Sequence, residues 1–212
     1  MHKPVYNQFK YIIFDLDDTL VDTSKTIQRR LKSAVDSFSL EANVTYLYEL
    51  VANPLRKELL AQNYEHSEIF WDEYERLRGI IYVNPMGNIR GIFDKLKAGG
   101  VKKGVLTNNT HNKALFKLRR CGINVTDLDG GFFNSDNLPF LKPDYRCFDF
   151  LSDKSSVVYI GDDLVDYTAA RDAGIAFLGV TSGLTSGEQF VNAGLNNPYI
   201  FGDVNQIKFE ND

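Results

Sequence analysis

The sequence predicts an α/β fold, a parallel sheet with helices on both faces, and two features of the chain lead to this prediction. Short apolar runs alternate with helical patterns along most of its 212 residues, which is typical of sheets built from strand–helix units. The apolar runs are unbroken, as expected for strands that are buried on both faces. With 43% hydrophobic and 25% charged residues, the composition is that of an ordinary globular chain and excludes disordered and fibrous classes.

The elements of this sheet follow one another in a regular order. The predicted strands cover residues 11–14, 104–106, 131–133, 157–160 and 175–180. Helical patterns are found between them, at about residues 86–98, 110–120, 143–151 and 163–173. Gly122 and Gly174 stand where helix C-caps are expected.

Residues from about 22 to 82 break this alternation. They contain no good strand, but apolar residues recur at helical spacing. The recurring residues are Ile27, Leu31, Val35 and Phe38, and then Phe70, Tyr74, Leu77 and Ile81. Pro54 is expected to end one helix and to begin another. The sequence therefore predicts an all-helical insert between the first strand and the rest of the sheet.

Charge and composition also bear on location and partners. The formal net charge of −4 leaves no basic footprint for nucleic acid. No apolar run approaches the ~20 residues that span a bilayer, and the N-terminus lacks the apolar stretch of a secretory signal. Cys121 and Cys147 form no Cys-x-x-Cys pair and are expected to be reduced. We expect a soluble, cytoplasmic protein with neither nucleic-acid nor membrane partner; the oligomeric state is open.

Two carboxylates follow the first predicted strand. Asp15 and Asp17 lie two residues apart, and this spacing in an extended segment points both side chains the same way. Ligands bind at the carboxyl edge of open α/β sheets, and two neighbouring carboxylates stay ionised most easily with a cation between them. Taken alone, the segment is equally well interpreted as a polar turn that caps the next helix.

Two further junctions offer groups that could bind phosphate. Thr107 and Asn108 follow the second strand, where a hydroxyl and turn amides can hold phosphate oxygens, although both residue types are also common N-caps. Lys142 could place a positive charge against a phosphate, with Pro143 at the first position of the following helix. A solvated loop lysine is the alternative for Lys142.

The fourth junction supplies more carboxylates, from Asp162, Asp163 and Asp166. Asp162 and Asp166 lie four residues apart and share one face if the helix has begun. Acidic residues also favour a helix N-terminus through the helix dipole, which is the structural alternative. Together, the four junctions supply what a Mg²⁺-assisted phosphoryl-transfer site needs.

These four segments, in this order, resemble the motifs of the haloacid dehalogenase-like hydrolase superfamily. The motifs correspond to residues 14–20, 106–109, 142–144 and 161–166. Residues 157–183 are similar to the phosphoglycolate phosphatase-like branch of the superfamily. The resemblance implies a Rossmann-like core formed by residues 1–21 and 83–212, with residues 22–82 as a small helical cap.

The resemblance also implies roles for residues in three of the motifs. Asp15 would be the nucleophile that becomes an aspartyl-phosphate. Asp17 would protonate the leaving oxygen and would then activate water. Thr107, Asn108 and Lys142 would hold the phosphoryl group.

A metal ion completes the site that the resemblance implies. Mg²⁺ would lie between the Asp15 carboxylate, the Asp17 carbonyl and Asp162, with Asp163 and Asp166 in support. The implied function is a Mg²⁺-dependent phosphatase whose partner is a small phosphorylated metabolite. A β-phosphoglucomutase-like phosphotransferase shares the four motifs and is the second interpretation. A non-catalytic binding protein of the same fold is the third.

Overall fold

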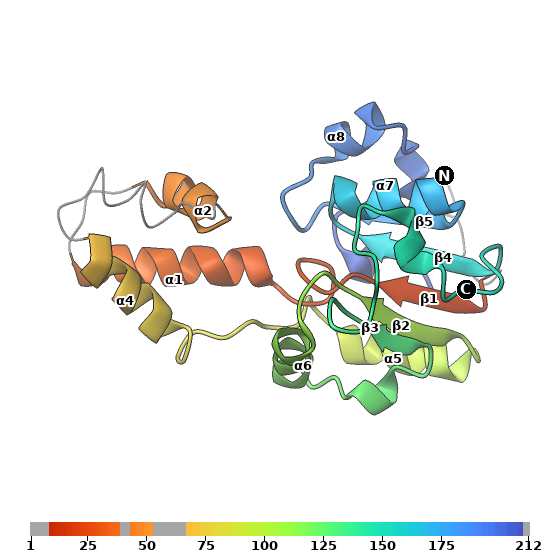
Figure 1. Cartoon of the computed structure of the whole chain (residues 1–212), viewed down its shortest axis with the longest axis horizontal. Helices are drawn as coiled ribbons and strands as arrows, with labels where there is room; N and C mark the ends of the chain where they lie inside the picture. Colours follow the sequence, from red (N-terminus) through yellow and green to blue (C-terminus); the bar gives the residue numbers. More distant parts are fainter. Residues whose placement is uncertain (1–8, 39–42, 53–66, 210–212) are drawn as a thin grey trace. The chain divides into compact units, whose positions relative to one another are not determined.

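The computed structural model describes residues 9–38, 43–52 and 67–209 (Figure 1). The chain divides into two compact units. One unit combines residues 1–22 with residues 84–212, and the other covers Thr23–Val83. We call them the core unit and the helical unit and describe each by itself.

The core unit is built on a six-stranded sheet with the order β3-β2-β1-β4-β5-β6. The strands are β1 (Tyr11–Phe14), β2 (Lys102–Leu106), β3 (Gly131–Phe133), β4 (Val157–Gly161), β5 (Ala176–Val180) and β6 (Ile200–Phe201). All neighbouring strands pair in parallel, so the predicted parallel α/β fold is confirmed. The strand order changes direction between β1 and β4, and ligands bind outside the carboxyl ends of the strands at such a point.

The register of the central strands aligns their carboxyl ends. Phe14 of β1 pairs with Val105 of β2 on one side and with Ile160 of β4 on the other. The amide of Asp15 continues this ladder by donating to the Ile160 carbonyl at 2.8 Å. Residues that follow β1, β2 and β4 therefore meet at one edge of the sheet.

Helices cover the sheet through the connections between parallel strands. The helices of the core unit are α5 (Ile89–Ala98), α6 (His111–Arg120), α7 (Leu164–Ala173) and the short α8 (Gly187–Asn192). The chain moves from β1 to β2 through α5 in one direction and from β4 to β5 through α7 in the other. Because such crossovers are right-handed, α5 and α7 lie on opposite faces (Figure 1).

The apolar spacing that predicts these helices matches the side chains that they bury. Helix α5 buries Ile89, Ile92, Phe93 and Leu96, and α7 ends at Gly174 in the left-handed conformation expected of a C-cap. Gly122, which follows α6, also has a positive φ of 73°.

The predicted helix at residues 143–151 is wrong. The structure has a 3₁₀ turn there, Tyr145–Phe148, and the side chain of Asp144 caps this turn by accepting from the Arg146 amide at 2.9 Å. Pro143 therefore does not open a helix. The turn buries the adjacent residues Cys147 and Phe148, and this apolar pair resembled part of a helical face. The sequence also gave no sign of β6, whose two residues are too few to show a pattern.

The described elements of the helical unit are all helices. They are α1 (Thr23–Ser37), α2 (Val44–Ala52) and α4 (Ser67–Leu77). Their shared core contains Leu31, Val35, Leu47, Phe70, Trp71 and Tyr74, among others. Phe38 and Ile81 of the predicted pattern lie beyond the helix ends, and Pro54 lies outside the described residues.

The helical unit leaves the core and returns to it at one point. The Asp22 amide donates to the Asn84 carbonyl at 3.0 Å, and the Asn84 amide donates to the Asp22 carboxylate at 2.6 Å. These two bonds hold the ends of the inserted segment together.

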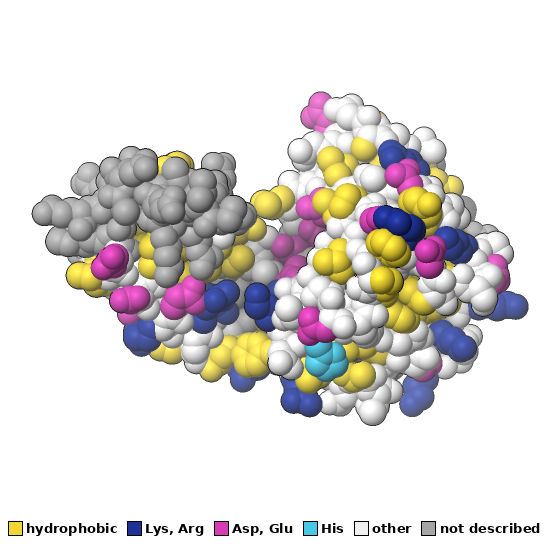
Figure 2. Space-filling view, viewed as in Figure 1, with side chains coloured by type: hydrophobic (Ala, Val, Ile, Leu, Met, Phe, Trp, Pro, Cys, Tyr) yellow, Lys and Arg dark blue, Asp and Glu magenta, His cyan; other side chains and the backbone are white. Residues whose placement is uncertain are grey.

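Within the described part of the chain, no helix is both long enough and apolar enough to cross a membrane. On the face of the core unit drawn in Figure 2, Lys and Arg side chains are interspersed with Asp, Glu and apolar side chains. They do not gather there into a continuous basic surface.

Candidate active site

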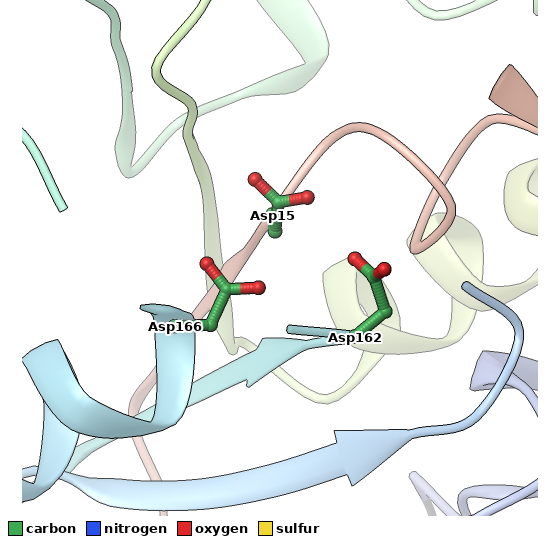
Figure 3. A group of neighbouring side chains, drawn as sticks. All are labelled: Asp15, Asp162 and Asp166. Atoms are coloured by element: carbon green, nitrogen blue, oxygen red, sulfur yellow. The ribbon is translucent and has the colours of Figure 1, made fainter. Parts of the chain in front are cut away.

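Three buried carboxylates meet at the carboxyl edge of the sheet. Asp15 follows β1, Asp162 follows β4, and Asp166 lies in the first turn of α7 (Figure 3). Each contributes an oxygen to a group in which all such atoms lie within 4.8 Å of one another. We call these residues the acidic triad. The structure thus brings together carboxylates from three of the predicted positions.

The loop between β4 and α7 accounts for the convergence of Asp162 and Asp166. Helix α7 begins at Leu164, so Asp162 precedes it and the condition under which the two carboxylates would share a helix face is not met. Asp163 is the N-cap, and its side chain accepts from the Val165 amide at 2.8 Å. Asp166 accepts from the Asp163 amide at 3.2 Å, which completes a capping box. The capping box directs the Asp166 side chain back toward the strand end.

Two glycines leave room for the triad. A Cβ atom on Gly161 would lie 2.4 Å from an Asp166 carboxylate oxygen, and one on Gly183 would lie 1.8 Å from an Asp162 oxygen. Real Cβ atoms do not approach oxygen so closely. The backbone of these two positions therefore forms part of the wall against which the carboxylates pack.

Lys142 lies within this group rather than in solvent. Its Nζ contacts Asp15 Oδ1 at 2.7 Å, Asp166 Oδ1 at 2.5 Å and the Tyr159 hydroxyl at 2.8 Å. Burial disfavours the ammonium, but the neighbouring Asp15 and Asp166 carboxylates outweigh burial and raise the Lys142 pKa above its ordinary value. The alternative of a solvated loop lysine is wrong, because Lys142 is only 7% exposed.

The negative charge of the triad exceeds what this ammonium can balance. Burial, together with the Asp166 and Asp17 carboxylates, raises the pKa of Asp15 to about 7 even though Lys142 opposes the rise. Burial and then the Asp15 and Asp166 carboxylates raise the pKa of Asp162 to about 10. Buried carboxylates in this condition either bind protons or gain a cation. Because all the donor atoms are carboxylate oxygens, the triad fits a hard divalent ion such as Mg²⁺.

Asp17 lies at the same edge of the sheet but has different partners. Its two carboxylate oxygens accept from the Lys117 ammonium and from the Asn109 side-chain amide. Its side chain is 29% exposed. The two acids of the first motif are therefore in different environments, Asp15 buried against a lysine and Asp17 partly open to solvent.

The loop after β2 contacts Asp17 through Asn109 and holds, through Asn108, the Lys142 that contacts Asp15. The buried Thr107 hydroxyl accepts from the amide and the side chain of Asn109 at 3.2 and 2.9 Å. The Asn108 side chain donates to the Lys142 carbonyl at 2.9 Å and accepts from the Lys142 amide at 3.1 Å. The Asn108 side chain is thus occupied by the Lys142 loop. Any contact of Asn108 with a phosphate would have to come from its backbone amide.

Several residues contact the site that the sequence patterns did not assign to it. Tyr159 donates to Asp166 at 3.0 Å, and a hydroxyl in an otherwise apolar strand was a signal that could have found it. Thr19, which donates to Asp162 at 3.2 Å, lies within the first motif. Asn109 is the last residue of the second motif, but it was given no role there. Lys117 gave no signal, because a lysine on an amphipathic helix is normally solvated.

Comparisons with known proteins agree with this geometry. Residues 12–180 match the haloacid dehalogenase-like hydrolase family. The phosphoglycolate phosphatase of Agrobacterium fabrum is 31% identical over 191 residues, which cover 82% of this chain and 81% of that protein. The glyceraldehyde 3-phosphate phosphatase of Methanothermobacter thermautotrophicus is 28% identical, over 94% of this chain and 98% of that protein.

A solved structure shows the same similarity. The crystal structure of a predicted phosphoglycolate phosphatase from Haemophilus somnus superimposes with a TM-score of 0.67 at 25% identity, over 92% of this chain and 95% of that one. The residues that match the family, 12–180, include Asp15, Lys142 and Asp162. This chain therefore belongs to the haloacid dehalogenase-like hydrolase family.

Proposed function

We propose that this hydrolase is a Mg²⁺-dependent phosphatase that cleaves a small phosphomonoester through an aspartyl-phosphate on Asp15. The observation that carries the proposal is the position of Asp15, whose carboxylate contacts the Lys142 ammonium at 2.7 Å and lies within the acidic triad. A carboxylate placed between a fixed cation and a candidate metal position is suited to attack an anionic phosphorus centre.

In the first step, an oxygen of Asp15 attacks phosphorus and the bond from phosphorus to the substrate oxygen breaks. Lys142, the Thr107 hydroxyl and the Asn108 amide hold the phosphoryl oxygens as charge shifts onto them. Mg²⁺, when held by the Asp15 carboxylate, the Asp17 carbonyl and Asp162, supplies positive charge that reduces repulsion between the two anions. Asp166 orients Lys142, and Asp163 keeps the helix end in place.

Asp17 acts as the general acid in the first step and as the general base in the second. It gives a proton to the departing oxygen, so that the alcohol leaves as a neutral group. As a carboxylate, it then takes a proton from the water that attacks phosphorus in the aspartyl-phosphate. The second step releases inorganic phosphate and regenerates the Asp15 carboxylate.

The relatives support a small substrate. Phosphoglycolate phosphatase and glyceraldehyde 3-phosphate phosphatase are named for short phosphorylated metabolites, so we propose a partner of that class. We also propose that residues 22–82 act as a cap that selects this substrate and excludes bulk water, apart from the water that is consumed in the second step.

A panel of phosphorylated metabolites, with p-nitrophenyl phosphate as an activated ester, tests the proposal by phosphate release. We expect turnover with Mg²⁺, none in excess chelator and none in Asp15→Asn, while Lys113→Met on the exposed face of α6 keeps wild-type rates. Activity in excess chelator would contradict the metal requirement. Transfer between two positions of a sugar without free phosphate would indicate the mutase interpretation. No turnover of any ester would favour the binding protein.

A further inference from the structure

Asp17 is held at both of its carboxylate oxygens. Oδ1 accepts from the Lys117 ammonium, and Oδ2 accepts from the Asn109 side-chain amide. The Lys117 side chain is 19% exposed and that of Asp17 29%. The ion pair is therefore partly shielded from water, unlike fully exposed surface pairs, which contribute little to stability.

Both donors belong to one segment of the chain. Asn109 is fixed by its hydrogen bond to the Thr107 hydroxyl at 2.9 Å. Lys117 comes from α6, where its neighbours Ala114 and Leu118 are buried, so the helix is anchored beneath it. The segment that supplies the hydroxyl for the phosphoryl group thus also determines where the Asp17 carboxylate lies.

This orientation matters for the chemistry. An aspartate side chain can occupy three staggered rotamers about χ1, and a general acid must lie within hydrogen-bond reach of the oxygen that it protonates. A displacement of about 1 Å can reduce the rate by roughly 100-fold. Two donors on opposite oxygens restrict both χ1 and the rotation of the carboxylate.

We infer that Lys117 is a positioning residue that holds Asp17 for its exchange of protons with the substrate. The inference rests on the proposed function, because it assigns Lys117 to the same reaction. Lys117 touches Asp17 rather than the reacting atoms. Its loss should therefore affect the chemical step more than substrate binding.

Steady-state kinetics on two esters test this role. In Lys117→Met, we expect kcat to fall by roughly 10- to 100-fold on an alkyl phosphate that the wild type cleaves, and by much less on p-nitrophenyl phosphate. The activated ester needs little protonation of its leaving group. KM should stay within about twofold on both esters. Lys117→Arg should recover part of kcat, because an arginine can also donate to Asp17. Lys113→Met, one turn earlier on the same helix, is the matched control and should match the wild type.

Two kinetic results would overturn the inference. Equal loss of kcat on both esters would show that Lys117 does not act through the leaving-group proton. A raised KM with unchanged kcat would show that Lys117 binds the substrate anion directly.

A measurement without substrate separates this inference from the proposed function. Lys117→Met and Asp17→Asn, alone and combined, form a double-mutant cycle in urea unfolding. We expect their effects on the unfolding free energy to be non-additive; additive effects would show that the pair does not exist and would overturn the inference. A wild-type protein that cleaves no phosphomonoester would instead reject the proposed function, and the cycle would still decide whether Lys117 holds Asp17.

Discussion

Lys142 and Asp166 form a buried ion pair with an N–O distance of 2.5 Å, and the same carboxylate closes the capping box of α7. Asp166 Oδ1 accepts from Lys142 and from the Tyr159 hydroxyl, whereas Oδ2 accepts from the Asp163 amide. One side chain thus fixes a lysine from a loop, a strand residue and the start of a helix. Stability and geometry of the site are coupled through this carboxylate.

The Tyr159 hydroxyl should contribute measurably to stability. Tyr159→Phe removes a fully buried group that accepts from Lys142 and donates to Asp166, and we expect the unfolding free energy to fall by about 1–3 kcal/mol. Urea unfolding checks this value. Tyr199→Phe, at a tyrosine that is 40% exposed, is the control and should change stability by less than about 0.5 kcal/mol. Equal effects in the two variants would contradict the network.

Replacement of Gly183 should weaken metal binding. In Gly183→Ala, the new Cβ would lie 1.8 Å from Asp162 Oδ2, so the carboxylate must move. We expect the Mg²⁺ concentration at half-maximal activity to rise by about tenfold or more. Gly187→Ala, whose Cβ would meet its nearest neighbour at 3.7 Å, should leave it unchanged. An unaltered Mg²⁺ requirement in Gly183→Ala would show that Asp162 is not a ligand.

The triad should make the metal-free protein less stable as pH rises, whereas most paired carboxylates make a protein more stable as pH rises. Its folded-state pKa values, about 7 for Asp15 and about 10 for Asp162, lie above those of an unfolded chain, so the folded protein binds more protons. Without metal, this contribution to stability should therefore decline as pH rises from about 4 through 7 and beyond. Because Mg²⁺ binds only the ionised carboxylates, its stabilising effect should grow over the same range.

Thermal unfolding at several pH values, with Mg²⁺ and with chelator, measures both trends. Asp162→Asn removes one of the two groups and should flatten the decline. If the stability difference between the metal-free wild type and Asp162→Asn shifted in favour of the wild type as pH rises, this would contradict the raised pKa values.

Substitution of Asp15 and substitution of Asp17 should have different kinetic effects. Asp15→Asn should form no phosphoryl-enzyme and show essentially no turnover, because the nucleophile is lost. Asp17→Asn should lose about 10²–10⁴-fold on unactivated esters and less on p-nitrophenyl phosphate. Intact mass spectrometry after rapid acid quench detects the covalent phosphate. A phosphoryl-enzyme in Asp15→Asn would reassign the nucleophile.

The sequence was sufficient for strands β1 to β5 and for the carboxylates, because both depend on local patterns. The unbroken apolar run of β4 predicts a buried strand, and the parallel register then places Asp15 and Asp162 at one edge. The short 3₁₀ turn after Pro143 was not predictable, since a capping side chain at Asp144 rather than periodicity determines it. Lys117 was not predictable either, because its partner Asp17 lies 100 residues away in the chain.

The paired bonds between Asp22 and Asn84 have an evolutionary consequence. These bonds hold together the two ends of the core chain that flank the inserted segment. The length and sequence of the segment can therefore change without moving the ends of β1 and of the chain that leads to α5. A recombination event that exchanges this segment would preserve the strand register and every residue of the acidic triad. Under the proposed role of residues 22–82 as the cap that selects the substrate, replacement of one contiguous stretch of gene would change the substrate preference and leave the hydrolytic residues of the core unit unchanged.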